Sequence, residues 1–310
     1  MSQLQPPADA GFHPGELAVQ QRAGVRQEAA RLTRMLEPAT LSSGMTAFLA
    51  ERTFLVITGR DRAGRLWTAP LTGPAGFLEG RPPAGLTVHA PVPPGDPLHG
   101  LPAGQKVGLT TVEFATRRRL RVNGILTAAG DEGLTVEVEQ AYGNCPQYIQ
   151  QRLLEPSGHA AGRDEVRHAA ILSAADGALI RRADTFFLGS VNPERGADAS
   201  HRGGAPGFVR LDGPARLWWP DYQGNNLFNS LGNLAVDAEA ALLFFDFGDG
   251  RALQLSGRAE VEWDQAGQPG DDDGTGRRVA FTIERVVSGR PLGVHEVAHA
   301  PYPRNPALSG

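Results

Sequence analysis

The chain has 310 residues, with 30 Lys and Arg residues against 34 Asp and Glu residues, and a formal net charge of −4. A chain of this length can hold two domains of ordinary size, each with its own core. This charge gives no electrostatic footprint for nucleic acid or an anionic membrane. The single cysteine, Cys145, excludes an internal disulfide.

The N-terminus has no basic segment followed by an apolar one, so it does not have the pattern of a signal peptide. No apolar run approaches the length of a membrane span. We therefore expect a soluble cytoplasmic protein without nucleic-acid or membrane partners.

The first residues predict a flexible lead over 1–15 and a helix over 16–36. Within the second range Val25, Ala29, Leu32 and Leu36 fall on one face at helical spacing, and Pro38 ends the pattern. We expect this helix to pack across a β-sheet.

The rest of the first half is typical of antiparallel β-structure. The predicted strands cover residues 54–58, 66–69, 86–90, 107–112, 120–126 and 134–139. The last two alternate apolar and polar residues, as half-buried strands do. Residues 91–104 are rich in proline and glycine and predict a loop.

The second half repeats this character after a predicted linker over 158–163 and a predicted helix from Asp164 to about Ala175. Its predicted strands cover 185–191, 207–211, 217–219, 241–247, 253–263 and 278–287. We divide the chain into an N-terminal arm and helix over 1–44, a first domain over 45–160 and a second domain over 161–310.

Two metal-binding patterns are weighed and rejected. The acidic segment 264–276 lacks the spacing of a calcium-binding EF-hand loop, so we expect a solvated loop. His295-Glu296-Val297-Ala298-His299 matches the H-E-x-x-H zinc pattern, which requires both histidines on a sustained helix. Prolines at 291, 301 and 303 leave little room for such a helix, so we do not expect zinc chemistry.

The segment 197–233 carries the densest polar pattern. A predicted strand ends in Ser200-His201-Arg202, a glycine-rich turn follows, and a second polar turn covers residues 221–226. A hydroxyl, an imidazole and a guanidinium beside glycine backbone can bind a phosphate. A hairpin that is rich in glycine for steric reasons, with a solvated Arg202, explains the same spacing equally well.

Four stretches of this half resemble the pyridoxamine 5′-phosphate oxidase-like, FMN-binding split β-barrel family. They are SHRGGAPGF (200–208), PDYQGNNLFNSLGNL (220–234), ALLFFDF (241–247) and LQLSGRAEV (253–261), after an apolar lead-in at 183–188. The close resemblance covers roughly the second half of the chain, and a weaker one covers most of the first. It implies a six-stranded Greek-key barrel with FMN at the interface of two barrels, and it leaves the substrate open.

The two halves align on each other with an offset near 132 residues, for example Thr53 on Thr185. Residues 72–77 match 203–208, and Val122-Asn123-Gly124 matches Leu255-Ser256-Gly257. The repeat predicts a mainly β fold (α+β) of two tandem six-stranded Greek-key split β-barrels, which form an intrachain pseudo-dimer with short flanking helices. Ala69-Pro70-Leu71 stands where the second half has Ser200-His201-Arg202, so only one barrel is expected to bind phosphate.

The resemblance also implies the residues of the FMN site. Ser200, His201 and Arg202, with the backbone of Gly203 and Gly204, would hold the phosphate. Asn225 and Asn226 would orient the ribityl chain or the ring, and Gln254 and Arg258 would face the isoalloxazine. The first half would supply the opposite wall through Tyr142, Asn144 and Tyr148.

The segment around Cys145 predicts a short helix. Asn144 is a candidate N-cap, with Gln147 three residues later as in a capping box. A cysteine in that first turn could be a redox nucleophile, but we expect Cys145 to be a small buried apolar group.

The function that the resemblance implies is an FMN-dependent oxidoreductase that transfers a hydride or electrons between the flavin and a small-molecule substrate or electron acceptor. No side chain is assigned as a catalytic acid or base. The alternative is a non-catalytic flavin- or haem-binding module that works with a separate reductase. His13, Glu16 and Gln20 favour the alternative, because they resemble the leader of family members that continue into a reductase module.

Overall fold

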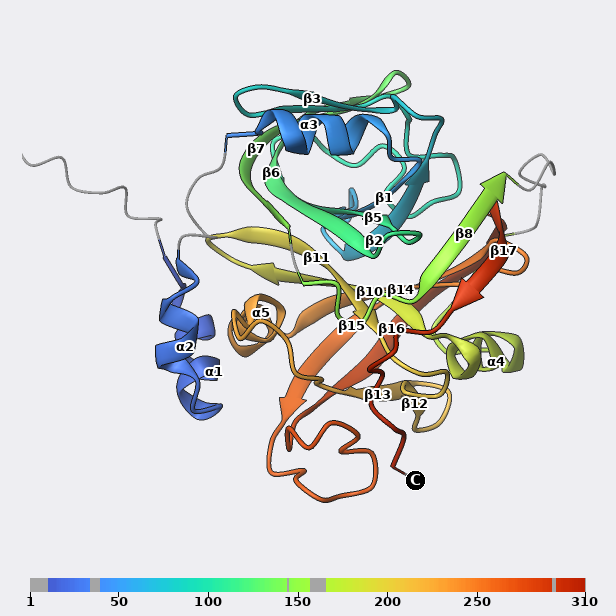
Figure 1. Cartoon of the computed structure of the whole chain (residues 1–310). Helices are drawn as coiled ribbons and strands as arrows, with labels where there is room; N and C mark the ends of the chain where they lie inside the picture. Colours follow the sequence, from blue (N-terminus) through green and yellow to red (C-terminus); the bar gives the residue numbers. More distant parts are fainter. Residues whose placement is uncertain (1–10, 34–39, 144, 157–165, 292–293, 310) are drawn as a thin grey trace, which may run out of the picture.

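The computed structural model describes residues 11–33, 40–143, 145–156, 166–291 and 294–309. In this part of the chain the protein is mainly β, with two large antiparallel sheets, one two-stranded sheet and five helices. Figure 1 shows the first sheet, crossed by one short helix, lying against the second sheet. Among the described helices none is long and apolar enough to cross a membrane.

The first sheet is built from residues 54–143 and has the strand order β2-β1-β5-β6-β7-β4-β3. Its strands are β1 (Phe54–Arg60), β2 (Leu66–Thr72), β3 (Leu78–Arg81), β4 (Gly85–Val88), β5 (Lys106–Glu113), β6 (Arg118–Gly130) and β7 (Gly133–Gly143). The six strands expected in this half are therefore confirmed, and β3 is added to them.

The second sheet follows the order β11-β10-β14-β15-β16-β13-β12, with β9 pairing to β16. Its strands are β9 (Arg167–Ala169), β10 (Thr185–Asn192), β11 (Gly196–Gly203), β12 (Arg210–Leu211), β13 (Arg216–Pro220), β14 (Glu239–Phe245), β15 (Arg251–Glu262) and β16 (Arg278–Pro291). The predicted strand over 207–211 shrinks to β12, because Gly207 takes a φ of +92° in the preceding turn.

The two sheets share one strand order, since adding nine to each strand number of the first gives the order of the second. Both long strands β6 and β15 carry a register shift at matched places, between Asn123 and Gly124 and between Ser256 and Gly257. A Cβ on Gly73 would lie 2.6 Å from Phe77, and one on Gly204 would lie 2.7 Å from Phe208. The two halves therefore repeat one another in detail.

The strand pairing corrects one part of the sequence alignment. Leu55 pairs with Leu71 in the first sheet, and Phe186 pairs with Arg202 in the second. Phe54 therefore corresponds to Thr185, one residue away from the expected Phe186. The same pairing places Ala69-Pro70-Leu71 at the positions that correspond to Ser200-His201-Arg202, as expected.

Helices lie mostly at the edges of the sheets. They are α1 (Pro14–Arg22), α2 (Arg26–Ala30), α3 (Ser43–Ala50), α4 (Ala174–Arg182) and α5 (Asn229–Val236). The single helix expected over 16–36 is wrong: it divides at Gly24, which takes a φ of +72°, and residues 34–39 lie outside the described part. The helix expected over 164–175 is also wrong, because β9 occupies part of it and Ser173 caps α4 with a capping box.

The H-E-x-x-H residues lie on strand β17 (Val294–Ala300), which pairs with β8 (Gln151–Pro156). His299 Nε2 lies 3.1 Å from Asp184. In the described ranges no three His, Cys, Asp or Glu residues are placed to share a metal ion. The two histidines of this motif therefore lie on a strand and not on one face of a helix. The expected linker over 158–163 lies outside the described residues.

An apolar layer joins the two sheets. One core cluster fills the first sheet and a second fills the second, while a third is built from both halves. In this third cluster Phe54 of β1 packs on Phe187 and Phe245, with ring centroids 5.8 and 5.4 Å away. The two sheets are thus parts of one packed body, and the edge of this layer meets the cavity described next.

Candidate functional site

A cavity lies where the end of β11 meets the first sheet. Its walls come from β6, from the 145–148 segment, from the end of β11, and from the loop that connects β13 to α5. Its polar lining is Arg119, Arg121, Cys145, Gln147, Tyr148, Ser200, His201, Arg202, Asp221, Tyr222, Gln223, Asn225, Asn226, Asn229 and Ser230. Residues of both halves therefore form one site.

Three guanidinium groups converge on this cavity. Arg119 and Arg121 point to the same side of β6 because side chains alternate along a strand, and Arg202 comes from β11. Arg121 forms an ion pair with Asp198 at 3.1 Å. Among the described residues no carboxylate lies within ion-pair distance of Arg119 or Arg202. The site therefore holds more positive charge than its own carboxylates neutralise.

His201 is buried between these arginines, and its protonation follows from its contacts. Arg119 Nη1 lies 3.2 Å from His201 Nδ1. Because a guanidinium can only donate, Nδ1 accepts this hydrogen bond and Nε2 carries the proton. Burial and the neighbouring Arg119 and Arg202 hold the pKa of His201 well below its usual range. His201 is therefore a neutral donor at neutral pH.

Several donors of the site have no protein acceptor. Within the described residues, Arg119 Nε, Arg121 Nε and His201 Nε2 are buried without a hydrogen-bond partner. Burial, together with the charges of its neighbours Arg121 and Arg202, lowers the pKa of Arg119. Buried donors and unpaired positive charge are costly unless an acceptor or an anion completes them. The residues present therefore fit a bound anion such as a phosphate.

The structure brings most of the predicted phosphate-binding residues together. Ser200, His201, Arg202 and Gly203 line the cavity, and Tyr148 faces them. A Cβ on Gly203 would lie 2.1 Å from the carbonyl oxygen of Tyr148, so glycine is required for this close approach. Gly204 is not among the lining residues, and its α-carbon packs on Phe208.

Ser200 has less freedom than the sequence suggests. Its hydroxyl donates to Asp198 Oδ2 at 2.9 Å and accepts from Ser230 at 2.8 Å. Arg121 Nη2 donates to the same hydroxyl. Ser200 therefore organises the wall of the cavity, while Arg119, Arg202 and His201 keep the available donors.

The polar turn at 221–226 forms the opposite rim. Asn225 and Asn226 line the cavity, and the Asn225 side chain accepts from the Leu227 backbone N–H at 3.2 Å. Asn226 and Phe228 both take a left-handed backbone conformation, with φ of 59° and 57°. Such conformations cost energy in residues other than glycine and gather at functional sites.

The segment before and after Cys145 differs from expectation. Residues 145–150 form a turn and no helix, and Asn144 lies outside the described residues. Cys145 is exposed rather than buried, and it lines the cavity. Tyr142 lies behind the wall: its hydroxyl accepts from Arg121 Nη1 at 2.9 Å, so it supports a cavity residue without being a lining residue.

Gln254 and Arg258 lie elsewhere, contrary to expectation. Gln254 Nε2 donates to the Thr68 carbonyl at 3.1 Å and to Asp96 at 3.2 Å. Arg258 pairs with Glu239 across the β14–β15 ladder and lines a separate cavity. Strand pairing gives the reason. Arg121 of β6 pairs with Thr110 of β5, and Gln254 of β15 pairs with Leu243 at the equivalent place on β14. Gln254 is thus the counterpart of Arg121 in the other half.

Arg119 and Arg121 are the site residues that sequence reasoning missed. The signal was the run Arg117-Arg118-Arg119-Leu120-Arg121, in which alternate arginines of a strand share one face. Arginine almost replaces lysine in this chain, in which Lys106 is the single lysine. Because arginines are common throughout, these arginines did not stand out.

A family model described as Pyridoxamine 5′-phosphate oxidase matches residues 172–270. This range includes Arg202, the polar turn with Asn225, and strands β10 to β15. Residues 172–270, within the second half, thus form an oxidase-like part of the chain. The arginines of β6 lie outside the matched range, so the cavity extends from this part into the first half.

Solved structures similar to parts of this chain include HupZ from Group A Streptococcus, with 11% identity, a TM-score of 0.30 and coverage of 45% of this chain and 99% of that one. A putative pyridoxamine 5′-phosphate oxidase from Lactobacillus delbrueckii has 16% identity, a TM-score of 0.31 and coverage of 37% and 93%. A protein from Clostridium acetobutylicum, related to general stress protein 26 of B. subtilis, has 17% identity and a TM-score of 0.31, and the match covers 39% of this chain and 90% of that one. No curated protein matched the chain.

The position that corresponds to Arg202 in the first half is apolar. Leu71, which corresponds to Arg202 of the oxidase-like part, packs in one apolar cluster with Val92, Leu98 and Leu101. These three residues come from the proline-rich loop 91–104, whose Asp96 also holds Gln254. An apolar side chain therefore stands where the second half has Arg202.

Proposed function

We propose that the chain binds FMN in this cavity and works as an FMN-dependent oxidoreductase. The observation that carries the proposal is the convergence of Arg119, Arg202 and neutral His201 in a buried site, where no described carboxylate lies within ion-pair distance of either arginine. The family match of the surrounding domain supports a flavin as the source of the anionic group.

In this proposal Arg202, Arg119 and His201 hold the phosphate, helped by the backbone at Gly203. Charge-assisted hydrogen bonds from two guanidinium groups suit a phosphate dianion. Asn225 and Asn226 orient the polar chain from the opposite rim, and Tyr148 closes the side of the first half. When bound, the flavin supplies the two-electron chemistry. The protein's contribution is binding, orientation and the exclusion of water.

The proposal includes the architecture. Two tandem split β-barrels would form an intrachain pseudo-dimer, with one composite FMN site between them. The shared strand order and the matched register shifts support this duplication. The apolar loop in the first half supports a single site, because a phosphate without donors is too costly to bury.

We expect the metal-free apoprotein to take up FMN and to show the visible absorption of a bound flavin. Reduction by NAD(P)H, followed by reoxidation with an added electron acceptor, would support an oxidoreductase. Bound flavin that no donor reduces would instead support a flavin-binding module without its own activity. A protein that takes up no FMN at any concentration would refute the proposed function.

A further inference from the structure

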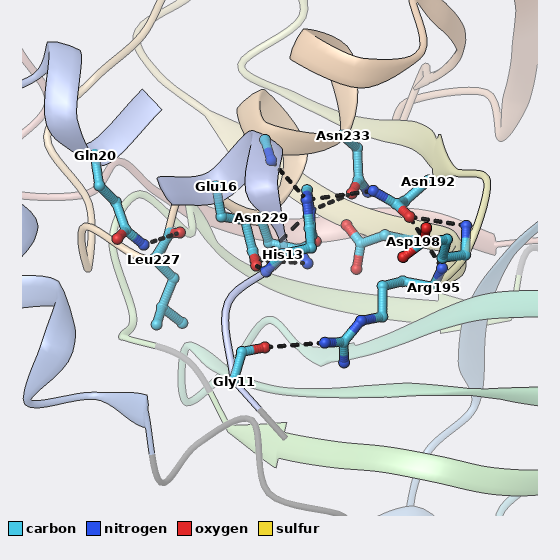
Figure 2. A network of polar contacts seen from close by, with 12 residues as sticks. Gly11, His13, Glu16, Gln20, Asn192, Arg195, Asp198, Leu227, Asn229 and Asn233 are labelled. Atoms are coloured by element: carbon cyan, nitrogen blue, oxygen red, sulfur yellow. Dashed lines mark hydrogen bonds and ion pairs between the residues drawn. The ribbon is translucent and has the colours of Figure 1, made fainter. Parts of the chain in front are cut away.

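A second cavity of about 420 Å³ lies beside the first, between the N-terminal arm, β7 and the start of β11. Its wall toward the proposed FMN cavity contains Asp198 and Asn229, and Asn229 lines both cavities. Figure 2 shows His13 of the arm beside Asn233 of α5 and Asn192 of β10, and Glu16 beside Asn229 of α5. The arm is therefore joined to the proposed site by polar contacts.

Helices α1 and α5 touch through two glycines. A Cβ on Gly15 would lie 2.1 Å from the carbonyl oxygen of Gly232, and one on Gly232 would lie 2.6 Å from Glu16. The contact is fixed further by His13, whose Nε2 lies 3.1 Å from Asn233 Oδ1. Residues 227–231, which precede and begin α5, line the proposed FMN cavity. The position of α1 thus bears directly on that cavity.

Glu16 is the buried carboxyl group of this contact, with an exposed fraction of 2%. Its Oε2 accepts from the His13 backbone N–H at 2.9 Å. Among the described residues no lysine or arginine lies within ion-pair distance of it, and His13 Nε2 is 3.7 Å away. His13 gives little charge there, since burial lowers its pKa to about 4.

Asn229 lies between Glu16 and Asp198. Its amide nitrogen, when it donates to Asp198, reaches Oδ2 at 3.0 Å and Oδ1 at 3.2 Å. The other end of this amide, its carbonyl oxygen in that orientation, is 3.4 Å from Glu16 Oε1. A carbonyl oxygen only accepts, so Glu16 completes this contact when it carries a proton.

We propose that protonated Glu16 is a positioning residue of the FMN cavity, which holds α1 against α5 and fixes Asn229 between itself and Asp198. The inference rests on the proposed function, because FMN is the ligand whose site it would position. Ionised Glu16 would place a second buried negative charge beside Asp198 and break the contact with Asn229. The arm would then release α5 and loosen the cavity.

The charges around Glu16 agree with this protonation. Burial, together with the charge of Asp198 on β11, raises the pKa of Glu16 to about 7, against the opposing effects of the His13 N–H and of Arg195. Arg121 of β6 and Tyr142 of β7 also face this group, and each interacts with it electrostatically. The folded pKa is above the usual value, so the neutral form holds below about pH 7 and the ionised form takes over above it.

The test compares FMN affinity at about pH 6 and about pH 8.5 for three proteins. In the wild type we expect the dissociation constant to rise about tenfold, the effect of one pKa unit of coupling. In Glu16→Gln, which keeps the contacts of a neutral carboxyl, it should change by less than about threefold. Glu28→Gln, at an exposed position of α2, is the control and should follow the wild type.

Titration of the FMN phosphate affects all three proteins equally, so the difference between the curves isolates Glu16. Parallel curves for wild type and Glu16→Gln would overturn the inference. If the wild type binds no FMN at either pH, the proposed function fails separately. The inference then depends on tryptic cleavage of the arm at Arg22 and Arg26. The rate of this cleavage at about pH 8.5, divided by the rate at about pH 6, should be larger for the wild type than for Glu16→Gln. Equal rate ratios for the two proteins would overturn the inference.

Discussion

Replacing Phe187 by alanine should lower the free energy of unfolding by about 3–5 kcal/mol, the usual cost of removing a buried phenyl ring. Phe187 is 0% exposed in the cluster that joins the two sheets. Its ring lies 5.8 Å from Phe54, 6.0 Å from Phe245 and 5.5 Å from His201. Urea unfolding followed by tryptophan fluorescence would measure the loss.

Phe54 and Phe245 still join the two halves when the Phe187 ring is removed. The variant should therefore still unfold in a single transition. Leu153→Ala is the matched control, since Leu153 is 49% exposed on β8 and should change stability by less than about 0.5 kcal/mol. A cost for Phe187→Ala below about 1 kcal/mol would contradict the packing of the two sheets as one body.

Arg202→Ala should weaken FMN binding by roughly tenfold to a hundredfold and change riboflavin binding far less. A hydrogen bond to a charged group contributes about 1.5–3 kcal/mol, which corresponds to that range of affinity. Riboflavin lacks the phosphate that Arg202 is proposed to contact. Titrations monitored by quenching of flavin fluorescence would give both dissociation constants.

Arg210→Ala and Arg216→Ala are the controls for this variant. Both arginines belong to the same half, but each pairs with its own carboxylate, Asp272 and Glu262, at 2.7 Å. Neither residue lines the cavity. Equal losses of FMN affinity for all three variants, or equal losses of FMN and riboflavin affinity in Arg202→Ala, would contradict a phosphate site at Arg202.

The sequence predicts the long strands because their side chains alternate between a buried and a less buried face. β7 is an example, with burial that alternates along Leu134 to Val138. The short or exposed strands β3, β8, β9 and β17 escaped prediction for the opposite reason. β17 in particular is mostly exposed, so it carries no apolar alternation. The N-terminal helix was overextended because its spacing gave no weight to Gly24.

The candidate site was predictable where one segment supplies it, and less so where two distant segments meet. Ser200 to Gly203 form one strand end, so their proximity follows from their order. Arg119 and His201 are far apart in sequence, and only the packing of β6 on β11 brings them together. Gln254 was assigned to the wrong site for a related reason. It is the equivalent of Arg121 in the other repeat, so it lies near Thr68 and Asp96 and not at the cavity that contains Arg121.

The central claim is that one composite FMN site lies between the two halves, and titration of the apoprotein with FMN tests it most directly. The predicted result is saturation at one FMN per chain, with Arg119→Ala in the first half and Arg202→Ala in the second each weakening the binding of that same flavin. Two equivalent flavins per chain would contradict the account, and so would FMN affinity that Arg119→Ala leaves unchanged.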